Sequence, residues 1–180
     1  MAKAQIVYES VFGDNEALAT AIAKGLGRTM EVSLLSVQKA GLTLEGGLDL
    51  VVVGGPTQGF GLSRESTRQG VHEYSANLPL PEIGVGEWLN DLTLGPGQAP
   101  LAAAFGTNIG TPFWVRRLGK SAKKIEAKLK KKGFQLFTGS QVFLVETPTG
   151  PLIQGEIERA RRWGEKMGAR FEGEFYRPSL

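Results

Sequence analysis

The stretch Lys3-Ala-Gln-Ile-Val-Tyr-Glu-Ser-Val-Phe-Gly-Asp-Asn15 joins a strand pattern directly to a helix pattern. Residues 6–8 are apolar and favour a β-strand, while residues 16–26 place their apolar side chains on one face of a helix. The polar turn between them contains Gly13. A tight turn from a strand into a helix presents backbone N–H groups at the positive end of the helix dipole, and such groups bind anions. The stretch therefore predicts either a phosphate-binding turn of an open α/β sheet or an ordinary polar βα loop.

The rest of the chain alternates between the two patterns. Strands are predicted at residues 30–37, 48–53 and 101–105, and a last strand is interrupted, at 134–137 and 142–145. Helices are predicted at residues 63–76, 87–92, 121–132 and 154–171. The strand at 48–53 is nearly all apolar, which is typical of a strand covered on both faces. The chain is thus predicted to form one α/β domain over residues 1–180, with a doubly wound, parallel, five-stranded sheet in the order 2-1-3-4-5.

Two further predicted strands end in glycine-bearing loops. One reads Gly54-Gly-Pro-Thr-Gln-Gly-Phe-Gly61 and the other Gly106-Thr-Asn-Ile-Gly110. Glycine permits close approach of the backbone to another group, or a positive φ. In open α/β sheets, ligands bind outside the carboxyl ends of the strands, where the strand order reverses. We therefore expect the three loops to meet at one edge of the sheet around a ligand.

Composition excludes several classes of chemistry. The chain has 180 residues, 41% of them apolar, which suffices for a packed core. It has no cysteine, which rules out disulfides and thiolate chemistry, and its single histidine disfavours a histidine-rich zinc site or a Ser-His-Asp hydrolase. No apolar run approaches the ~18 residues of a membrane span, and no secretory pattern is visible. We therefore expect a cytoplasmic protein without a membrane segment.

The net charge of +3 is unevenly distributed. The segment from Arg116 to Lys132 holds nine of the 21 basic residues and a single acid, Glu126. This charge run is either a solvated helix face or a docking patch for an acidic partner. Because no aromatic side chains are interleaved along the predicted helix, nucleic acid is not expected as a partner.

Two motifs and the order of elements resemble the flavodoxins, and more closely the flavodoxin-like proteins of actinobacteria. The motifs are Tyr8-Glu-Ser-Val-Phe-Gly-Asp-Asn15 and Gly54-Gly-Pro-Thr-Gln-Gly-Phe-Gly-Leu-Ser-Arg64. The resemblance covers almost the whole chain. It implies a flavodoxin-like fold, non-covalent FMN and a role in electron transport.

The first loop matches the flavodoxin phosphate loop only in part. That loop usually reads hydroxyl-x-hydroxyl-Gly-x-hydroxyl. Ser10 keeps the first hydroxyl and Gly13 keeps the glycine, whereas Phe12 and Asn15 replace the other two hydroxyls. Asp14 stands where asparagine is common.

The resemblance implies that the three loops contact FMN, with no catalytic residue and no metal ligand. The implied contacts are Ser10, Val11, Phe12, Gly13, Asp14, Asn15, Pro56, Thr57, Gln58, Gly59, Phe60, Gly61, Phe105, Gly106, Thr107, Asn108 and Trp114. Phe60 is the first choice for stacking on the ring, and Trp114, with Phe113, is an alternative outer wall or loop packing.

Asp14 is the departure with the largest expected consequence. A carboxylate ~4 Å from a phosphate costs about 4 kcal/mol per pair of unit charges at an effective dielectric near 20. That is a weakening of roughly a thousandfold. Either Asp14 turns outward and favours the N-terminus of the following helix, or the ligand carries less negative charge at this point.

Three functions remain open from the sequence. The first is an electron carrier, a monomer or weak dimer, that docks an acidic redox partner near Arg116 to Lys132. The second is an FMN-dependent NAD(P)H:acceptor oxidoreductase of the quinone type, in which NADPH alone bleaches the flavin. The third is a cofactor-free interaction module of the same topology, which takes up no added FMN.

Overall fold

The computed structural model describes residues 1–59, 61–73, 77–111 and 120–175. Within these residues, six strands form one parallel sheet in the order β2-β1-β3-β4-β5, with β6 also paired to β4. The strands are β1 (Ala2–Tyr8), β2 (Met30–Ser36), β3 (Leu50–Pro56), β4 (Leu101–Ile109), β5 (Gln135–Leu136) and β6 (Gln141–Val145). The predicted doubly wound order is confirmed.

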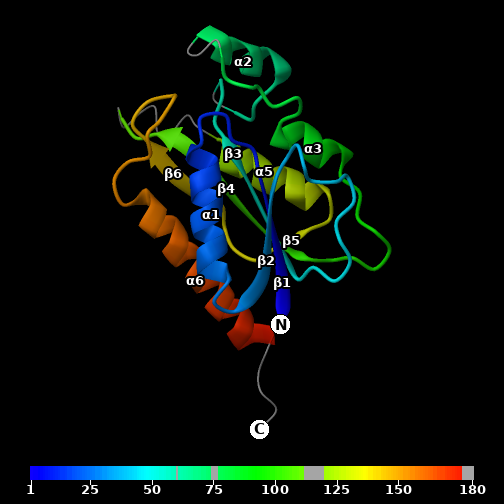
Figure 1. The fold of residues 1–180 in the computed structure, drawn as a ribbon. Helices are drawn as coiled ribbons and strands as arrows, with labels where there is room; N and C mark the ends of the chain where they lie inside the picture. The colour runs from blue at the N-terminus through cyan, green and yellow to red at the C-terminus, as the bar shows by residue number, and fades with distance from the viewer. Residues whose placement is uncertain (60, 74–76, 112–119, 176–180) are drawn as a thin grey trace.

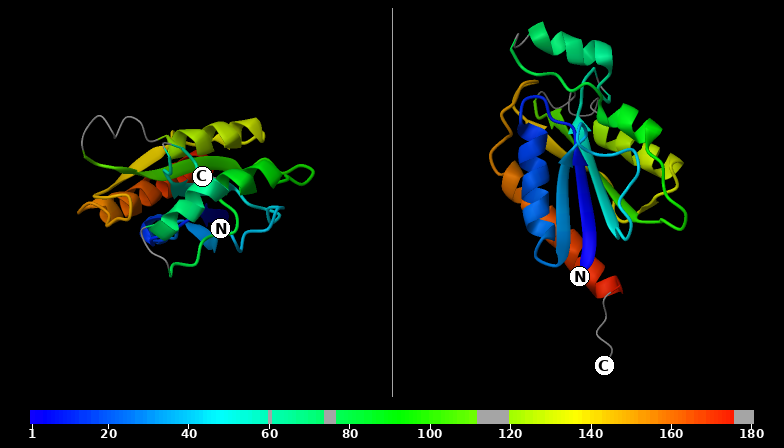
Figure 2. Two further views of the ribbon diagram at one scale, coloured as in Figure 1. Left: turned by 90° about the horizontal axis from the view of Figure 1, so that it is seen from above. Right: turned by 45° about the vertical axis from the view of Figure 1, so that its right-hand side comes forward.

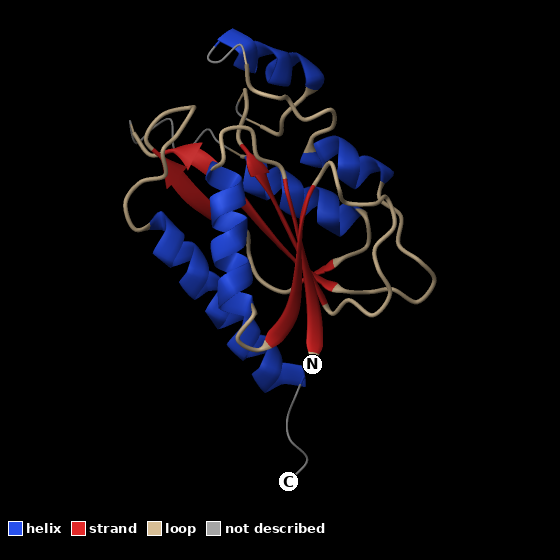
Figure 3. Cartoon of the chain, in the orientation of Figure 1, coloured by secondary structure: helices blue, strands red, loops and turns tan. Residues whose placement is uncertain are grey.

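Helices cover both faces of the sheet, as Figures 1 and 2 show. One face carries α1 (Asp14–Leu26) and α6 (Glu156–Phe175), and the other carries α3 (Val85–Asp91) and α5 (Ser121–Lys131). A short helix, α2 (Glu65–Gln69), and a 3-10 turn, η1 (Gly70–Glu73), stand beyond the carboxyl ends of the strands (Figure 3). No helix in the described ranges is long and apolar enough to cross a membrane.

The central strand shows why the sheet is a double-sided core. Every side chain from Leu50 to Val53 is fully buried. Leu50 and Val52 pack on the α1 and α6 side, whereas Val51 and Val53 pack on the α3 and α5 side. Successive side chains of the strand point to opposite faces of the sheet, and all of them are apolar. This is the pattern expected of a parallel strand that is covered by helices on both faces.

Glycines let α1 and α6 pack backbone to backbone. A Cβ at Gly25 would collide with the carbonyl oxygen of Arg161, and a Cβ at Gly164 would collide with that of Ile22. Larger side chains at these positions would force the helices apart, so the glycines fix α1, and with it the turn before it, against the rest of the fold.

The edge strand is interrupted, as the sequence predicts. Leu101 pairs with Gln135 and Phe105 pairs with Gln141, so four steps along β4 are matched by six along the edge. The two additional residues are accommodated in the break between β5 and β6, residues 137–140.

Glu126 of α5 fills this break. Its carboxylate accepts the N–H of Ser140 at 3.0 Å and lies 3.2 Å from the ammonium of Lys123 and 3.3 Å from that of Lys130. Burial acts to raise the pKa of Glu126, but the hydrogen bonds from Ser140 and the two lysines outweigh it and lower the pKa to about 2. The single acid of the basic segment is thus internal to the fold.

Two elements differ from their predictions. The helix predicted over residues 63–76 is only the five-residue α2 followed by η1, and residues 74–76 lie outside the described ranges. The strand predicted to end at Phe105 continues to Ile109, because residues 105–109 pair with β6 and residues 105–107 also pair with β3. Part of the loop expected after the fourth strand is therefore still strand.

Candidate functional site

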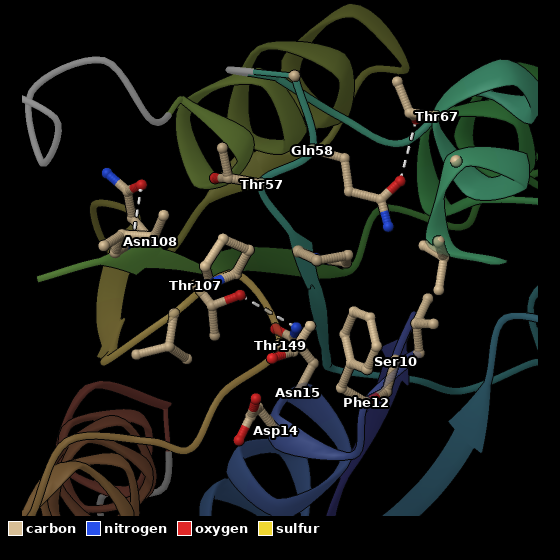
Figure 4. A pocket seen from close by; sticks show the side chains of 18 residues that line it. Ser10, Phe12, Asp14, Asn15, Thr57, Gln58, Thr67, Thr107, Asn108 and Thr149 are labelled. Atoms are coloured by element: carbon tan, nitrogen blue, oxygen red, sulfur yellow. Dashed lines mark hydrogen bonds between the residues drawn. The ribbon is translucent and has the colours of Figure 1, made fainter. Parts of the chain in front are cut away.

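A cavity of about 410 Å³ lies at the carboxyl ends of the strands, below α2 and η1 (Figure 4). This size is typical of small-molecule sites, which span about 300–1,000 Å³. Its lining consists of Ser10, Val11, Phe12, Asp14, Asn15, Pro56, Thr57, Gln58, Gly59, Thr67, Gly70, Val71, Thr107, Asn108, Ile109, Val145, Pro148 and Thr149. We refer to it as the strand-end cavity.

The turn between β1 and α1 forms one end of this cavity. Gly13 adopts φ of +97°, which favours glycine, and its N–H donates to the Ser10 hydroxyl oxygen at 3.2 Å. The main-chain N–H groups of Val11, Phe12 and Asp14 have no acceptor within the described residues. They remain available to a ligand at the positive end of the α1 dipole. The turn therefore leaves three main-chain donors at this end of the cavity without an acceptor in the described part of the chain.

Asn15 links this turn to β4. Its side-chain amide donates to the Thr107 hydroxyl at 3.1 Å (Figure 4), and the residue is only 4% exposed. Its carbonyl oxygen Oδ1 is buried and has no partner among the described residues. A buried acceptor without a donor is costly unless a ligand supplies one. A hydroxyl group on a bound ligand would donate to this oxygen.

The loop after β3 is held as a tight turn. The N–H of Gln58 donates to the carbonyl of Gly61 at 2.9 Å, and the N–H of Gly61 donates to the carbonyl of Gln58 at 3.0 Å. The Thr67 hydroxyl donates to Gln58 Oε1 at 3.0 Å, which turns the amide NH2 of Gln58 toward the cavity (Figure 4). Thr57 donates to the Ser121 hydroxyl at 2.8 Å. The second loop thus presents one fixed amide donor to the cavity.

The remaining walls are mostly apolar. They are formed by Phe12, Pro56, Val71, Ile109, Val145 and Pro148. Apolar walls interrupted by a few fixed polar groups suit a flat aromatic ring with a polar edge.

Asp14 is the one charged residue that lines the strand-end cavity within the described part of the chain. Its carboxylate accepts the N–H of Leu152 and lies against Gly150, in the loop between β6 and α6. Burial raises its pKa, and the bond from Leu152 opposes the rise. Asp14 is also one of the two acids in the first turn of α1, where a negative charge is favourable to the helix dipole, while its carboxylate bonds to the neighbouring loop.

A buried cluster of charged residues lies next to the site. Arg68, 2% exposed, donates to the Ser63 hydroxyl at 3.2 Å and pairs with Glu87 at 2.8 Å. Glu9, 1% exposed, accepts the N–H of Val85 at 2.8 Å. Burial raises the pKa of Glu9, while Ser63, Val85 and Arg68 act to lower it. This cluster ties the end of β1 to α2 and α3.

The structure brings most of the predicted contact residues together. Those that line the strand-end cavity are Ser10, Val11, Phe12, Asp14, Asn15, Pro56, Thr57, Gln58, Gly59, Thr107 and Asn108. Gly13 shapes the turn without lining the cavity. Phe60 and Trp114, together with Phe113, lie outside the described residues.

Three predicted contacts lie elsewhere. Phe105 is fully buried in the core on the α1 and α6 side, edge-to-face with Phe143 at 6.3 Å. Gly106 packs against Ser121 of α5, where a Cβ would not fit. Gly61 lines a separate cavity. None of the three lines the strand-end cavity. For Phe105 and Gly106 the reason is that β4 continues through these residues as paired strand.

Sequence reasoning missed part of the lining. The missed residues are Thr67, Gly70, Val71, Ile109, Val145, Pro148 and Thr149. Val145 is the last residue of β6, and Pro148 and Thr149 follow that strand, so the same strand-end rule could have found them. Glu9 directly follows the first strand but was assigned no role, and Arg68 carried no such signal because it follows no strand.

Structural comparison places the fold among known proteins. No protein-family model and no curated protein sequence matches the chain. Oxidised Flavodoxin 2 from Bacillus cereus matches with a TM-score of 0.61 at 18% identity, over 94% of this chain and 100% of that one. A flavodoxin from the domain Archaea matches with a TM-score of 0.60 at 16% identity, over 94% and 99%. A flavodoxin from Streptococcus pneumoniae gives 0.60 at 18%, also over 94% and 99%. The fold is therefore flavodoxin-like.

Proposed function

We propose that the protein binds FMN in the strand-end cavity and carries electrons between redox partners. The observation that carries the proposal is a cavity with apolar walls that opens at one end onto free N–H groups of the α1 turn. The solved flavodoxins of the same fold support it at the level of fold. The closer resemblance to actinobacterial flavodoxin-like proteins stays a prediction.

The donors and acceptors that line the cavity match the chemical groups of FMN. The phosphate would be held by the main-chain N–H groups of Val11, Phe12 and Asp14 and by the Ser10 hydroxyl, with the α1 dipole in place of a cation. Asn15 Oδ1 is the acceptor that a ribityl hydroxyl would satisfy. The Gln58 amide would donate to a ring-edge acceptor.

The flavin would supply the redox chemistry, and the chain would bind it, orient it and limit access to it. Outer-sphere electron transfer requires no acid, base or nucleophile from the protein. The lining, in which Asp14 is the one charged residue among those described and bonds to Leu152, is consistent with such a role.

The test is a titration of flavin-free protein with FMN and, separately, with riboflavin, followed by visible absorption and calorimetry. We expect one FMN per chain and riboflavin binding weaker by at least about tenfold, since charge-assisted hydrogen bonds to the phosphate are lost. Ser10→Ala should weaken FMN but not riboflavin. Ser36→Ala, at the end of β2 and in neither cavity, is the matched control. A spectrum of FMN unchanged by excess protein would instead favour the cofactor-free module.

The oxidoreductase and the carrier differ in one measurement on the loaded protein. A carrier keeps its flavin oxidised when NADPH is added without a partner protein, whereas the oxidoreductase bleaches it. For the carrier we propose an acidic partner that docks near the basic segment, of which residues 120–132 are described. Its transfer rate should fall as ionic strength rises.

A further inference from the structure

A second cavity, also of about 410 Å³, adjoins the strand-end cavity. It is lined by Gln58, Gly59, Gly61, Leu62, Ser63, Arg64, Ser66, Thr67, Gly86, Glu87, Asn90, Lys124 and Lys128. Gln58, Gly59 and Thr67 belong to both linings, so the turn at 58–61 and the start of α2 form a common wall. We call this second space the basic cavity.

The charge of the basic cavity is positive. Arg64, Lys124 and Lys128 line it, against the single carboxylate of Glu87. That carboxylate is already neutralised, because it pairs with the buried Arg68 at 2.8 Å and accepts the N–H of Gly84 at 2.6 Å. Three cations therefore face the cavity without a free anion to offset them.

Two of these cations have no carboxylate partner. Neither the guanidinium of Arg64 nor the ammonium of Lys124 makes an ion pair within the described residues. Lys124 lies directly against the main chain of Gly61, where a Cβ would collide with its Nζ. The absence of a side chain at Gly61 thus gives Lys124 access to the common wall.

Two other lysines of α5, and Lys132 directly after it, are bonded within the fold. Lys123 and Lys130 pair with Glu126. Lys132 donates to the main-chain carbonyls of Asn90 and Leu92, at 2.5 and 2.8 Å. These three lysines are thus engaged with other parts of the fold, whereas Lys124 makes no such bond within the described residues.

Lys128 lies one turn beyond Lys124 and lines the same cavity. It donates to Asn90 Oδ1 at 2.5 Å, which leaves the amide NH2 of Asn90 as a further donor at the cavity. Two lysines, a guanidinium, an amide and the hydroxyl of Ser66 therefore converge from α5, α3 and α2.

We propose that the basic cavity binds the phosphoryl group of a small molecule. A phosphate or diphosphate offers several oxygens to several donors, and arginine suits it by bidentate contact while lysine acts as a point charge. A single carboxylate would leave most of these donors unused. The site is independent of flavin in the strand-end cavity, but its ligand would lie across the common wall from that cavity.

The experiment is calorimetry at low ionic strength with pyrophosphate, adenosine 2′,5′-bisphosphate and adenosine. We expect the two phosphorylated compounds to bind with Kd at or below about 1 mM and adenosine not to bind. If the bisphosphate binds more tightly than pyrophosphate, the natural ligand is a nucleotide. If the two bind equally, the natural ligand is a free polyanion. Binding should persist in the presence of excess FMN and in Ser10→Ala, which separates this site from the α1 turn.

Variants test the residues. Lys124→Met and Arg64→Met should each weaken pyrophosphate by about tenfold, the worth of a charge-assisted hydrogen bond, and should leave FMN binding intact. Lys166→Met, an exposed lysine on α6 across the sheet, is the control of equal charge.

The proposal is overturned if neither phosphorylated compound binds below about 10 mM. It is also overturned if Lys166→Met weakens binding as much as Lys124→Met, since the attraction would then be diffuse. Binding of a hexa-aspartate peptide in preference to pyrophosphate would show a protein-docking surface in place of a phosphoryl site. Because both substituted side chains are exposed, loss of folding is not expected, and thermal unfolding verifies it.

Discussion

The strand-end cavity and the basic cavity have the same volume and share a wall, yet their chemistry is opposite. The first is lined by apolar side chains, amides and hydroxyls, with Asp14 as its one charged residue among those described. The second is lined by three cations and few apolar groups. One turn, at 58–61, thus separates a site suited to a neutral ring from a site suited to an anion.

The difference follows from the elements that supply each wall. Ends of parallel strands bring main-chain groups and short side chains together, so the strand-end cavity is largely neutral. The basic cavity is walled by the exposed flank of α5, where long cationic side chains reach over a glycine. Neighbouring cavities can therefore acquire different ligands without a change in the sheet.

The largest effect is expected from Arg68→Met, which tests whether the two cavities share one scaffold. Loss of the guanidinium leaves the buried Glu9 and the partly buried Glu87 without their cation. We expect the free energy of unfolding to fall by about 3–5 kcal/mol. Urea denaturation measures it. Arg162→Met breaks only an exposed pair with Glu158 and should cost about 0–1 kcal/mol.

Both binding activities should decline together in Arg68→Met, because the residue holds the common wall. The destabilisation should shrink in acid, where protonation of Glu9, whose pKa burial raises, removes its uncompensated charge. Full retention of both activities would show that the wall does not depend on the ion cluster.

Gly13→Ala should affect only the strand-end cavity. The left-handed backbone at φ +97° costs a residue with a Cβ about 1–2 kcal/mol, and relaxation of the turn would displace the N–H groups of the anion site. We expect FMN binding to weaken by about tenfold and riboflavin and pyrophosphate binding to stay unchanged. Gly97→Ala, at φ +73° and with equally open space, carries the same strain far from either cavity. Equal loss of FMN affinity in both variants would contradict the assignment.

Glu126→Gln tests whether the carboxylate that pairs with Lys123 and Lys130 stabilises the fold. The folded-state pKa of about 2 lies below the ordinary 4.5, so the ionised carboxylate stabilises the fold above pH 4.5. This contribution is lost as pH falls from 4.5 toward 2. We expect the variant to lose on the order of 1 kcal/mol at neutral pH, since its lysine partners are exposed, and to lack that part of the acid transition. Acid denaturation followed by circular dichroism checks it.

Asp14→Asn should have the smallest effect. Because the carboxylate is directed at Leu152 and Gly150, we expect FMN affinity to rise by no more than about threefold. Asp91→Asn, at the end of α3, matches the change in charge. A rise of several hundredfold would show that the acid faces the phosphate.

The sheet order and the first turn could be predicted from local pattern. The apolar run ending at Val53 identified the central strand, and the glycines after it marked the loop. The extension of β4 through residues 106–108 could not, because Gly106 and Asn108 are poor strand formers and pairing with β6 overrides that preference.

The candidate site divides in the same way. Ser10 and Gln58 were identifiable because each follows a predicted strand, and the sheet itself brings strand ends together. Thr149 follows the last strand by the same rule but stood in a turn to which no role was assigned.

The sequence by itself determined the periodic pattern, the positions of the turns and the lack of cysteine chemistry, because these are properties of residues close together in the chain. Only the tertiary structure decided that Lys124 lies against Gly61, that Arg68 pairs with Glu87 and that Asp14 is directed at Leu152. Such contacts join residues whose separation in sequence carries no periodic signal. They depend on how helices pack on the sheet, which local propensity does not specify.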